Sequence, residues 1–243
     1  MSGIILINSN LNKDVMVNSI FCLKCVRVMQ DLTDDEIREI SNSVEEASYR
    51  AGEVIYVPEQ SQGKIYFVRE GEVDIYQKSI SGKTFVVSTL QAGDIFGDLD
   101  LSSEHKMNVN FAKAVKPTKV CIVDKVSFMV YLQKKPQVAM RIIEELSKRL
   151  NEAEEKIRDL AFNEVKIRLL NELWRLAMKF GRKESDGYLV IEKKLTHQDL
   201  ANRISASRET VTKAMGELEE KGFIAYNNNR LIVLNINKIN ITL

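Results

Sequence analysis

The spacing of apolar residues changes from short strand-like runs to a long helical pattern at about residue 130, and this change constrains the fold more than any other feature. Between about residues 47 and 128, short runs rich in β-branched and aromatic residues are punctuated by glycines at steps of 11, 8, 11 and 11 residues. These glycines are Gly52, Gly63, Gly71, Gly82 and Gly93. Short strands with turn signals every 8–12 residues are typical of a β-sandwich or barrel. Because helical spacing follows, we expect an α+β chain in which a barrel precedes the helices.

Length and composition limit the class of protein. The chain has 243 residues, a length that favours two domains, and its 44% hydrophobic and 28% charged residues are ordinary for a folded protein. No run approaches the roughly 20 apolar residues of a membrane helix, and we find no secretion signal. Three cysteines are too few for a disulfide framework. We therefore expect a cytoplasmic protein with no membrane partner.

Charge is divided unevenly between the two parts of the chain. Residues 1–160 hold 21 basic and 24 acidic side chains, whereas residues 161–243 hold 14 basic and 10 acidic ones. A basic C-terminal part is compatible with a polyanionic partner, but an ordinary solvated surface carries a similar charge.

Two helices are predicted before the C-terminal part. The first covers residues 31–43, where Thr33 and Glu36 have the spacing of a capping box. The second begins near Pro136, and its apolar residues recur at steps of 3, 4, 3, 4 and 3, as in the seam of a two-stranded coiled coil. The seam residues are Ile143, Leu146, Leu150, Ala153, Ile157 and Leu160. We predict a homodimer joined along this helix; the alternative is a helix that packs on its own barrel.

A segment near the C-terminus has the pattern of a winged helix-turn-helix. Thr196 and Asp199 have the spacing of a second capping box, and a further helix begins near Ser207 after a tight turn. Two short strands at 223–226 and 231–234 follow and form the predicted wing.

The outward residues at the start of the second of these helices are suited to reading DNA. Arg208 and Lys213 can donate to guanine O6 and N7, and Glu209 can accept from cytosine N4. The predicted DNA-contacting residues are Thr196, Ser207, Arg208, Glu209, Thr210, Thr212 and Lys213. The alternative is an ordinary helical hairpin with a solvated charged face. We do not expect an enzyme, because no catalytic constellation can be assembled around the two histidines, His105 and His197.

Five motifs give the chain a resemblance to a known family. They are Gly52-Glu53, Gly71-Glu72-Val73, Gly93-Asp94-Ile95-Phe96-Gly97, Leu160-Ala161-Phe162 and Ser207-Arg208-Glu209-Thr210-Val211. From about residue 31 onward, the chain resembles the superfamily of the cyclic-AMP receptor protein and the fumarate-nitrate reduction regulator (Crp/Fnr). The resemblance implies an N-terminal segment (1–30), a cyclic-nucleotide-binding-like jelly-roll barrel (31–136), a dimerisation helix with its hinge (137–162) and a winged helix-turn-helix domain (163–243).

The resemblance also implies a function. It implies a transcription regulator, activator or repressor, that binds palindromic double-stranded DNA as a homodimer and contacts RNA polymerase. Half-sites one helical turn apart follow from the symmetry of a dimer, and the resemblance of the reading helix implies a half-site near TGTGA. An event in the barrel is expected to reorient the DNA-reading domains through the hinge at residues 160–163, by a population shift.

The effector cassette departs from the pattern of the cyclic-nucleotide-binding members. The resemblance assigns the sugar, phosphate and base contacts, in that order, to Gly97-Asp98-Leu99, Asn108-Val109 and Ala153-Glu154. Because no cation stands at the phosphate positions, cyclic AMP is not expected as the effector. His105 and Lys106 either supply substitute charge or lie at the surface. A cyclic-nucleotide-responsive regulator and a constitutive regulator are the alternatives to one switched by another effector or by a redox signal.

The three cysteines resemble part of a metal site. Cys22, Cys25 and Cys121 match three of the four cysteines that hold an iron–sulfur cluster in oxygen-sensing members, and the fourth position falls near Asp31. The alternatives are a thiol switch and purely structural cysteines. A shared cluster requires the N-terminal segment to fold back beside the strand predicted at 120–123.

Overall fold

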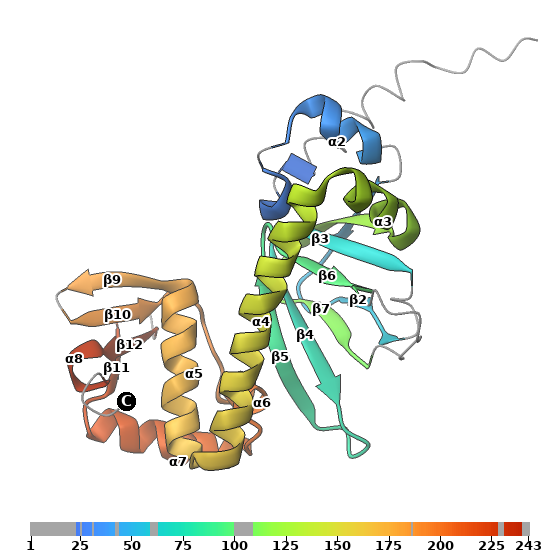
Figure 1. The fold of residues 1–243 in the computed structure, drawn as a ribbon. Helices are drawn as coiled ribbons and strands as arrows, with labels where there is room; N and C mark the ends of the chain where they lie inside the picture. Colours follow the sequence, from blue (N-terminus) through green and yellow to red (C-terminus); the bar gives the residue numbers. More distant parts are fainter. Residues whose placement is uncertain are drawn as a thin grey trace, which may run out of the picture. The chain divides into compact units, whose positions relative to one another are not determined.

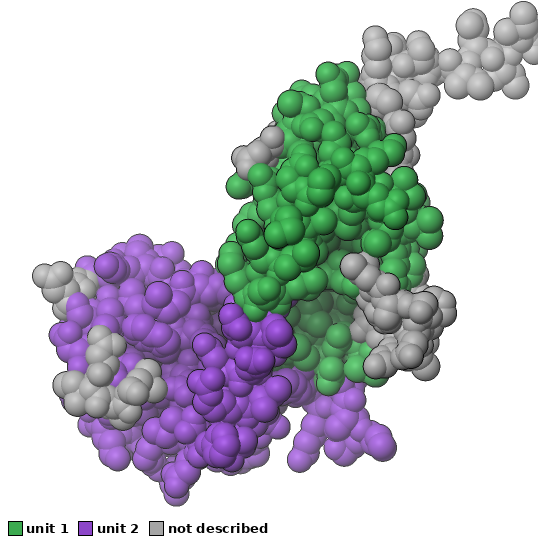
Figure 2. Space-filling view, in the orientation of Figure 1, with its two compact units in different colours: residues 1–77, 86–148 green, residues 78–85, 149–243 purple. Residues whose placement is uncertain are grey.

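In the computed structural model the chain divides into two units (Figure 2). The first unit consists of residues 1–77 and 86–148, and the second consists of residues 78–85 and 149–243. The structure describes residues 23–24, 26–30, 32–41, 44–58, 63–99, 109–185, 187–227 and 231–239. The division falls inside a single long helix, whereas the sequence pattern placed the domain boundaries at the two ends of that helix.

Two four-stranded sheets form the barrel of the first unit, with strand orders β1-β8-β3-β6 and β2-β7-β4-β5 (Figure 1). The strands are β1 (Val44–Tyr49), β2 (Val54–Tyr56), β3 (Lys64–Glu70), β4 (Glu72–Lys78), β5 (Thr84–Gln91), β6 (Ile95–Gly97), β7 (Phe111–Ala114) and β8 (Thr118–Asp124). The apolar runs of the sequence at 54–57, 65–68, 73–76, 85–87 and 120–123 coincide with β2, β3, β4, β5 and β8, whereas β1, β6 and β7 have no such run. These three are short or have few apolar residues, so they lack a clear alternation.

Side chains of the first sheet alternate between two separate apolar clusters. Tyr66 and Val120 point into the barrel, where the cluster between the sheets is formed. Their neighbours Phe67 and Cys121 belong instead to a cluster on the outer face. This alternation follows from the two-residue period of a β-strand, and it places the Cys121 side chain outside the barrel interior.

Helices cover the outer face of this sheet. They are the 3-10 helix η1 (Arg27–Met29), α2 (Asp34–Ser41), α3 (Lys125–Lys134) and the first turns of α4 (Pro136–Phe162). The predicted capping box of α2 is present, because the Thr33 N–H donates to Glu36 and the Glu36 N–H donates to the Thr33 hydroxyl. The sequence did not predict α3. Its valines and aromatic residues suit a strand, and the helix instead begins where the Asp124 carboxylate accepts from the Ser127 N–H at 2.9 Å.

The second unit holds a three-helix core and a four-stranded sheet with the order β11-β12-β10-β9. Its elements after α4 are α5 (Val165–Phe180), β9 (Gly181–Ser185), β10 (Tyr188–Ile191), α6 (His197–Ile204), α7 (Arg208–Glu220), β11 (Ile224–Tyr226), β12 (Ile232–Asn235) and α8 (Ile236–Ile239). The order of α6, α7 and the β11–β12 hairpin is that of a winged helix-turn-helix. The α+β fold class with a barrel, a long helix and this domain is thereby confirmed.

Among the described residues, no helix is both long and apolar enough to cross a membrane.

Candidate DNA interface and signal-receiving positions

The turn between α6 and α7 fixes the start of the candidate reading helix. Ser205 adopts a left-handed backbone with φ of 53°, and the Ala206 N–H donates to the Ala201 carbonyl at 3.1 Å. The Ser207 hydroxyl then accepts from the Thr210 N–H at 3.1 Å and caps α7. The first turn of α7 is therefore held in one position by local hydrogen bonds.

The two faces of α7 differ sharply in exposure. Val211, Ala214, Met215 and Leu218 are buried in the core of the unit. The predicted DNA-contacting residues Thr196, Ser207, Arg208, Glu209, Thr210, Thr212 and Lys213 are all exposed. A polar, solvent-facing N-terminal half of the second helix is the arrangement that enters a major groove.

Local hydrogen bonds already occupy some of these exposed groups. The Thr212 hydroxyl donates to the Arg208 carbonyl at 2.9 Å and lies 2.8 Å from His197 Nδ1. The Thr196 hydroxyl completes the confirmed capping box with Asp199. Backbone hydrogen bonding at the helix start, aided by Ser207, holds the pKa of the Glu209 carboxyl below its ordinary value, so this side chain stays an anionic acceptor. Arg208, Glu209 and Lys213 are therefore exposed charged side chains at the start of α7.

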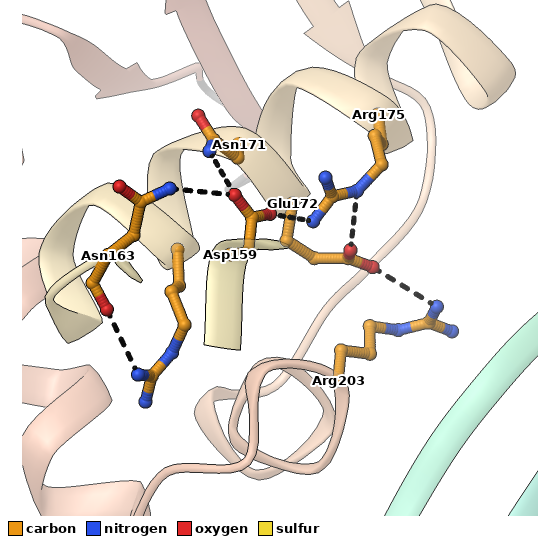
Figure 3. A network of polar contacts seen from close by, with 7 residues as sticks. Asp159, Asn163, Asn171, Glu172, Arg175 and Arg203 are labelled. Carbon is orange, nitrogen blue, oxygen red and sulfur yellow. Dashed lines mark hydrogen bonds and ion pairs between the residues drawn. The ribbon is translucent and has the colours of Figure 1, made fainter. Parts of the chain in front are cut away.

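A buried polar cluster joins the end of α4 to α5 and α6 (Figure 3). The Asp159 carboxylate accepts from Asn163 Nδ2 at 2.9 Å, from Asn171 Nδ2 at 2.7 Å and from the Arg175 guanidinium at 2.8 Å. Glu172 pairs with Arg175 at 3.1 Å and with Arg203 at 3.6 Å. We call these six residues the hinge cluster. Asp159, Glu172 and Arg203 are each at least nine-tenths buried.

Sequence reasoning did not find the hinge cluster. The Asn163 amide donates back to Asp159, and Glu164 occupies the N-cap of α5 without a side-chain hydrogen bond. Two of the three partners of Asp159, Asn171 and Arg175, lie on α5 rather than on its own helix, so no spacing along α4 could have indicated them. The predicted hinge at residues 160–163 is bridged by this cluster.

The described residues near the N-terminus share an apolar cluster with Cys121 of β8. Leu23 and Val26 are fully buried in the same cluster as Cys121, which is itself fully buried and disulfide-bonded. Arg27 forms an ion pair with the buried Asp94, and its N–H donates to the Gly93 carbonyl at 3.2 Å. Residues 23–29 therefore pack on the same sheet face as Cys121. The other predicted ligand positions, Cys22, Cys25 and Asp31, lie outside the described residues.

Comparisons with known proteins decide the family. Residues 46–135 match the cyclic nucleotide-binding domain, and residues 167–240 match the Crp-like helix-turn-helix domain. The anaerobic regulatory protein of Bacillus subtilis is 30% identical over 171 residues, which cover 70% of this chain and 71% of that protein. The chain belongs to the Crp/Fnr family of transcription regulators.

Other Crp/Fnr proteins agree over most of the chain. The CRP-like cAMP-activated global transcriptional regulator of Mycobacterium tuberculosis is 22% identical over 197 residues, covering 81% of this chain and 87% of that protein. The structure of a CooA mutant from Carboxydothermus hydrogenoformans shares the fold, with a TM-score of 0.75 and 21% identity over 90% of this chain and 94% of that one.

The positions of the Crp/Fnr effector cassette have structural roles here. Asp98, at the sugar position, accepts from the Gly63 N–H at 3.0 Å and pairs with Lys125 Nζ at 2.8 Å. Gly97 has a φ of +103°, and an added Cβ would lie 2.6 Å from the Lys64 carbonyl oxygen. Leu99 packs against the outer cluster. The one carboxylate of this turn is therefore committed to an ion pair within the barrel.

The remaining effector positions are described only in part. Val109 is exposed, and Asn108, His105 and Lys106 lie outside the described residues. Ala153 and Glu154 are on α4 in the second unit.

The barrel interior is packed with aromatic side chains. The ring centroids of Tyr56 and Tyr66 are 5.3 Å apart, and those of Tyr66 and Phe96 are 5.1 Å apart. Burial raises the pKa of Tyr66 to about 12, so its phenol stays neutral.

Proposed function

We propose that this Crp/Fnr protein is a homodimeric, sequence-specific DNA-binding regulator that responds to a signal other than cyclic AMP. The observation that carries the proposal is the exposed polar start of α7, with Arg208 and Glu209 on a turn fixed by Ser207. The β11–β12 wing packs on the same core as α7, from which it can reach the phosphate backbone. Thr196 and Thr210, near the same turn, are further candidates for backbone contacts.

The apolar seam of α4 supports the homodimer. Ile143, Leu150 and Ile157 are 54%, 59% and 65% exposed. Burial of one such side chain is worth about 1.5–3 kcal/mol, so pairing two copies of α4 along this seam is favourable. Among the described residues, the buried α4 side chains in the barrel-side cluster are Val138 and Ile142, which are not seam positions. This distribution favours a second copy over packing on the chain's own barrel.

A palindromic site follows from that symmetry. Two α7 helices related by a two-fold axis enter successive major grooves one helical turn apart. We propose half-sites near TGTGA, with RNA polymerase as the partner through which binding changes transcription.

For the signal, we propose a redox or metal event at the cysteines. Cys22, Cys25, Cys121 and Asp31 are the residues that would hold an iron–sulfur cluster, which when bound supplies oxygen-sensitive chemistry. The packing of Leu23 and Val26 beside Cys121 supports convergence of these positions, while the disulfide at Cys121 supports a thiol switch equally. Anaerobic purification followed by an absorption spectrum and an iron assay separates the two. A colourless, iron-free protein that still binds DNA after Cys22→Ser would leave the cysteines structural.

Cyclic AMP is disfavoured by the contacts of the barrel. The Asp98 carboxylate is paired with Lys125, and aromatic rings fill the interior between the sheets. A cyclic-nucleotide-responsive regulator predicts that cyclic AMP raises DNA affinity. If the regulator is constitutive, protein purified without ligand should bind DNA with nanomolar affinity. Neither added ligand nor oxidation would then change that affinity.

The test of specific DNA reading is the variant Arg208→Ala. We expect a loss of roughly 1–3 kcal/mol on the palindrome and a relaxed preference at one guanine. Lys221→Ala is the matched control, because Lys221 is an exposed cation just after α7, far from its start. Gel-shift titrations of palindromic and scrambled duplexes at one salt concentration measure both variants. An equal loss on both duplexes would make Arg208 a phosphate contact and count against base reading.

A further inference from the structure

A histidine side chain joins the two helices of the helix-turn-helix. His197 is the first residue of α6, and it is partly exposed. Its ring nitrogen Nδ1 lies 2.8 Å from the hydroxyl oxygen of Thr212, which is on α7. The same hydroxyl donates to the Arg208 carbonyl at 2.9 Å. The imidazole is therefore held at the candidate DNA interface by a contact with the reading helix.

The contacts of Thr212 determine which ring nitrogen carries a hydrogen. A hydroxyl has one hydrogen to donate, and the Arg208 carbonyl can only accept it. Both contacts of this hydroxyl are hydrogen bonds at once only if His197 Nδ1 is the donor at the other contact. A neutral imidazole has a single N–H, so Nε2 is then an acceptor in the neutral ring and a donor in the protonated ring. Within the described part of the chain, Nε2 has no hydrogen-bond partner.

The position of the ring brings it towards the phosphate backbone of bound DNA. In a helix-turn-helix the first helix crosses the backbone while the second enters the major groove. Thr196 and Thr212, which precede the ring and contact it, are both exposed and are both proposed DNA contacts. A phosphate oxygen is an anionic acceptor, so it is repelled by the lone pair of a neutral ring and bound by a protonated one.

The charges near this contact favour an anionic partner. The charged residues within one helical turn of His197 or Thr212 are Lys193, Lys194, Asp199, Arg208, Glu209 and Lys213. Four of them are basic and two are acidic. The Asp199 carboxylate is occupied by the N–H and hydroxyl of Thr196, at 2.9 and 2.7 Å. The surroundings of the ring are therefore cationic and attract a phosphate group.

The charges that α5 brings to the two helices are paired further along them. Glu172 of α5 pairs with Arg203 of α6 at 3.6 Å. Lys166 of α5 pairs with Glu217 of α7 at 3.3 Å. Backbone hydrogen bonding lowers the pKa of the Glu209 carboxyl, and carboxylate, lysine and arginine side chains ordinarily keep their charge between about pH 6 and 8. Histidine is the side chain that ordinarily titrates in this range, so a change of charge here falls on His197.

We propose that His197 is a proton-dependent contact to the DNA backbone. In the complex the ring is protonated, with Nδ1 donating to Thr212 and Nε2 donating to a phosphate oxygen. Binding of DNA then takes up one proton for each reading domain, and the affinity for DNA falls as pH rises. This inference rests on the proposed DNA-binding function and adds a control by pH to it. Because a phosphate contact carries no sequence information, the effect is the same on every duplex.

The DNA affinity of the full-length protein at two pH values tests the proposal. Fluorescence anisotropy is measured on the palindrome and on a scrambled duplex at about pH 6 and about pH 8, at one salt concentration. We expect wild-type affinity for both duplexes to be at least about tenfold lower at the higher pH, and that of His197→Gln to change less than about threefold. His197→Arg carries a permanent charge and should keep its affinity at the higher pH. His105→Gln, at the other histidine of the chain, is the control and keeps the wild-type pH dependence.

A second variant tests the role of the hydroxyl. In Thr212→Val, Nδ1 loses its acceptor, so the neutral ring can place its single hydrogen on Nε2 and still donate to phosphate. We expect the difference in affinity between the two pH values to shrink. The ratio of the two affinities is the readout, because Thr212 is itself a proposed DNA contact.

The outcomes separate this inference from the proposed function. Equal pH dependence of the wild type and His197→Gln would overturn the inference and leave DNA reading in place. A lack of preference for the palindrome at either pH would contradict the proposed function, while the pH dependence on the scrambled duplex would still decide the role of His197. A protein that binds neither duplex would overturn both.

Discussion

Replacement of Asp159 by asparagine tests the energetic role of the hinge cluster. The carboxylate is 6% exposed and accepts from Asn163, Asn171 and Arg175 at 2.7–2.9 Å. Asp159→Asn keeps the shape but removes the charge, and its amide group cannot accept all three donors. Losing one partner of a buried ion pair costs about 3–5 kcal/mol. Arg175 keeps its contact with Glu172 and is 23% exposed, so we expect a smaller loss, about 2–3 kcal/mol.

Denaturant unfolding of the full chain, followed by far-ultraviolet circular dichroism, measures this loss. The control is Glu155→Gln, an exposed carboxylate on the same helix, for which we expect a change below about 0.5 kcal/mol. The double variant Asp159→Asn/Arg175→Gln should show a coupling energy of about 1–3 kcal/mol. If Asp159→Asn unfolds with the same free energy as the control, the cluster does not stabilise the junction between α4 and α5, and the reasoning fails.

Three further predictions follow from the barrel and from α4. Gly97→Ala should lower the free energy of unfolding by at least about 2 kcal/mol more than Gly82→Ala does. Both glycines have a positive φ, but only at Gly97 would the added Cβ meet a backbone oxygen, at 2.6 Å. Equal melting temperatures of the two variants would contradict this. Hydrogen bonds from Thr33 and then Lys135 lower the pKa of Glu36 to about 2, from an ordinary 4.5, so this group stabilises the fold above about pH 4.5 and progressively less as pH falls towards 2. Glu36→Gln should therefore be less stable than wild type at pH 7, with a gap that narrows below pH 4.5 in urea titrations; a constant gap would refute it. Leu150→Glu on the exposed seam should shift the protein towards monomers in analytical ultracentrifugation, whereas an unchanged mass would remove the seam from the dimer interface.

The elements with a strong local signal were predictable from the sequence. The capping boxes at Thr33 and Thr196, the serine at the start of α7 and the continuous apolar run of β3 all act over a few residues, so the local sequence alone indicates them. The start of α4 at Pro136 is local in the same sense.

The features that depend on long-range contacts were not predictable. The sequence of α3 suits a continuation of the strand β8. The segment is helical because Asp124 caps its start and because Phe128 and Tyr131 of the helix pack in the outer cluster. From the sequence alone, Asp159 is expected to be an exposed carboxylate on a charged helix. Its burial depends on Asn171 and Arg175, which lie 12 and 16 residues further along the chain on α5. The sequence gives the return of the N-terminal segment to the strand at 120–123 only as a requirement of a shared cysteine site, because nothing local in either segment specifies that Leu23 and Cys121 join one cluster.

The proposed regulator reads a palindrome through two copies of α7. It is tested most directly by titrating the purified protein against a TGTGA palindrome, the same palindrome with five base pairs inserted at its centre, and a scrambled duplex, all at one salt concentration. The insertion turns one half-site by about half a helical turn and leaves every base contact within a half-site unchanged. We predict that the palindrome binds at least about 10³-fold more tightly than the scrambled duplex and that the insertion abolishes most of this difference. Equal affinity for all three duplexes would contradict the account.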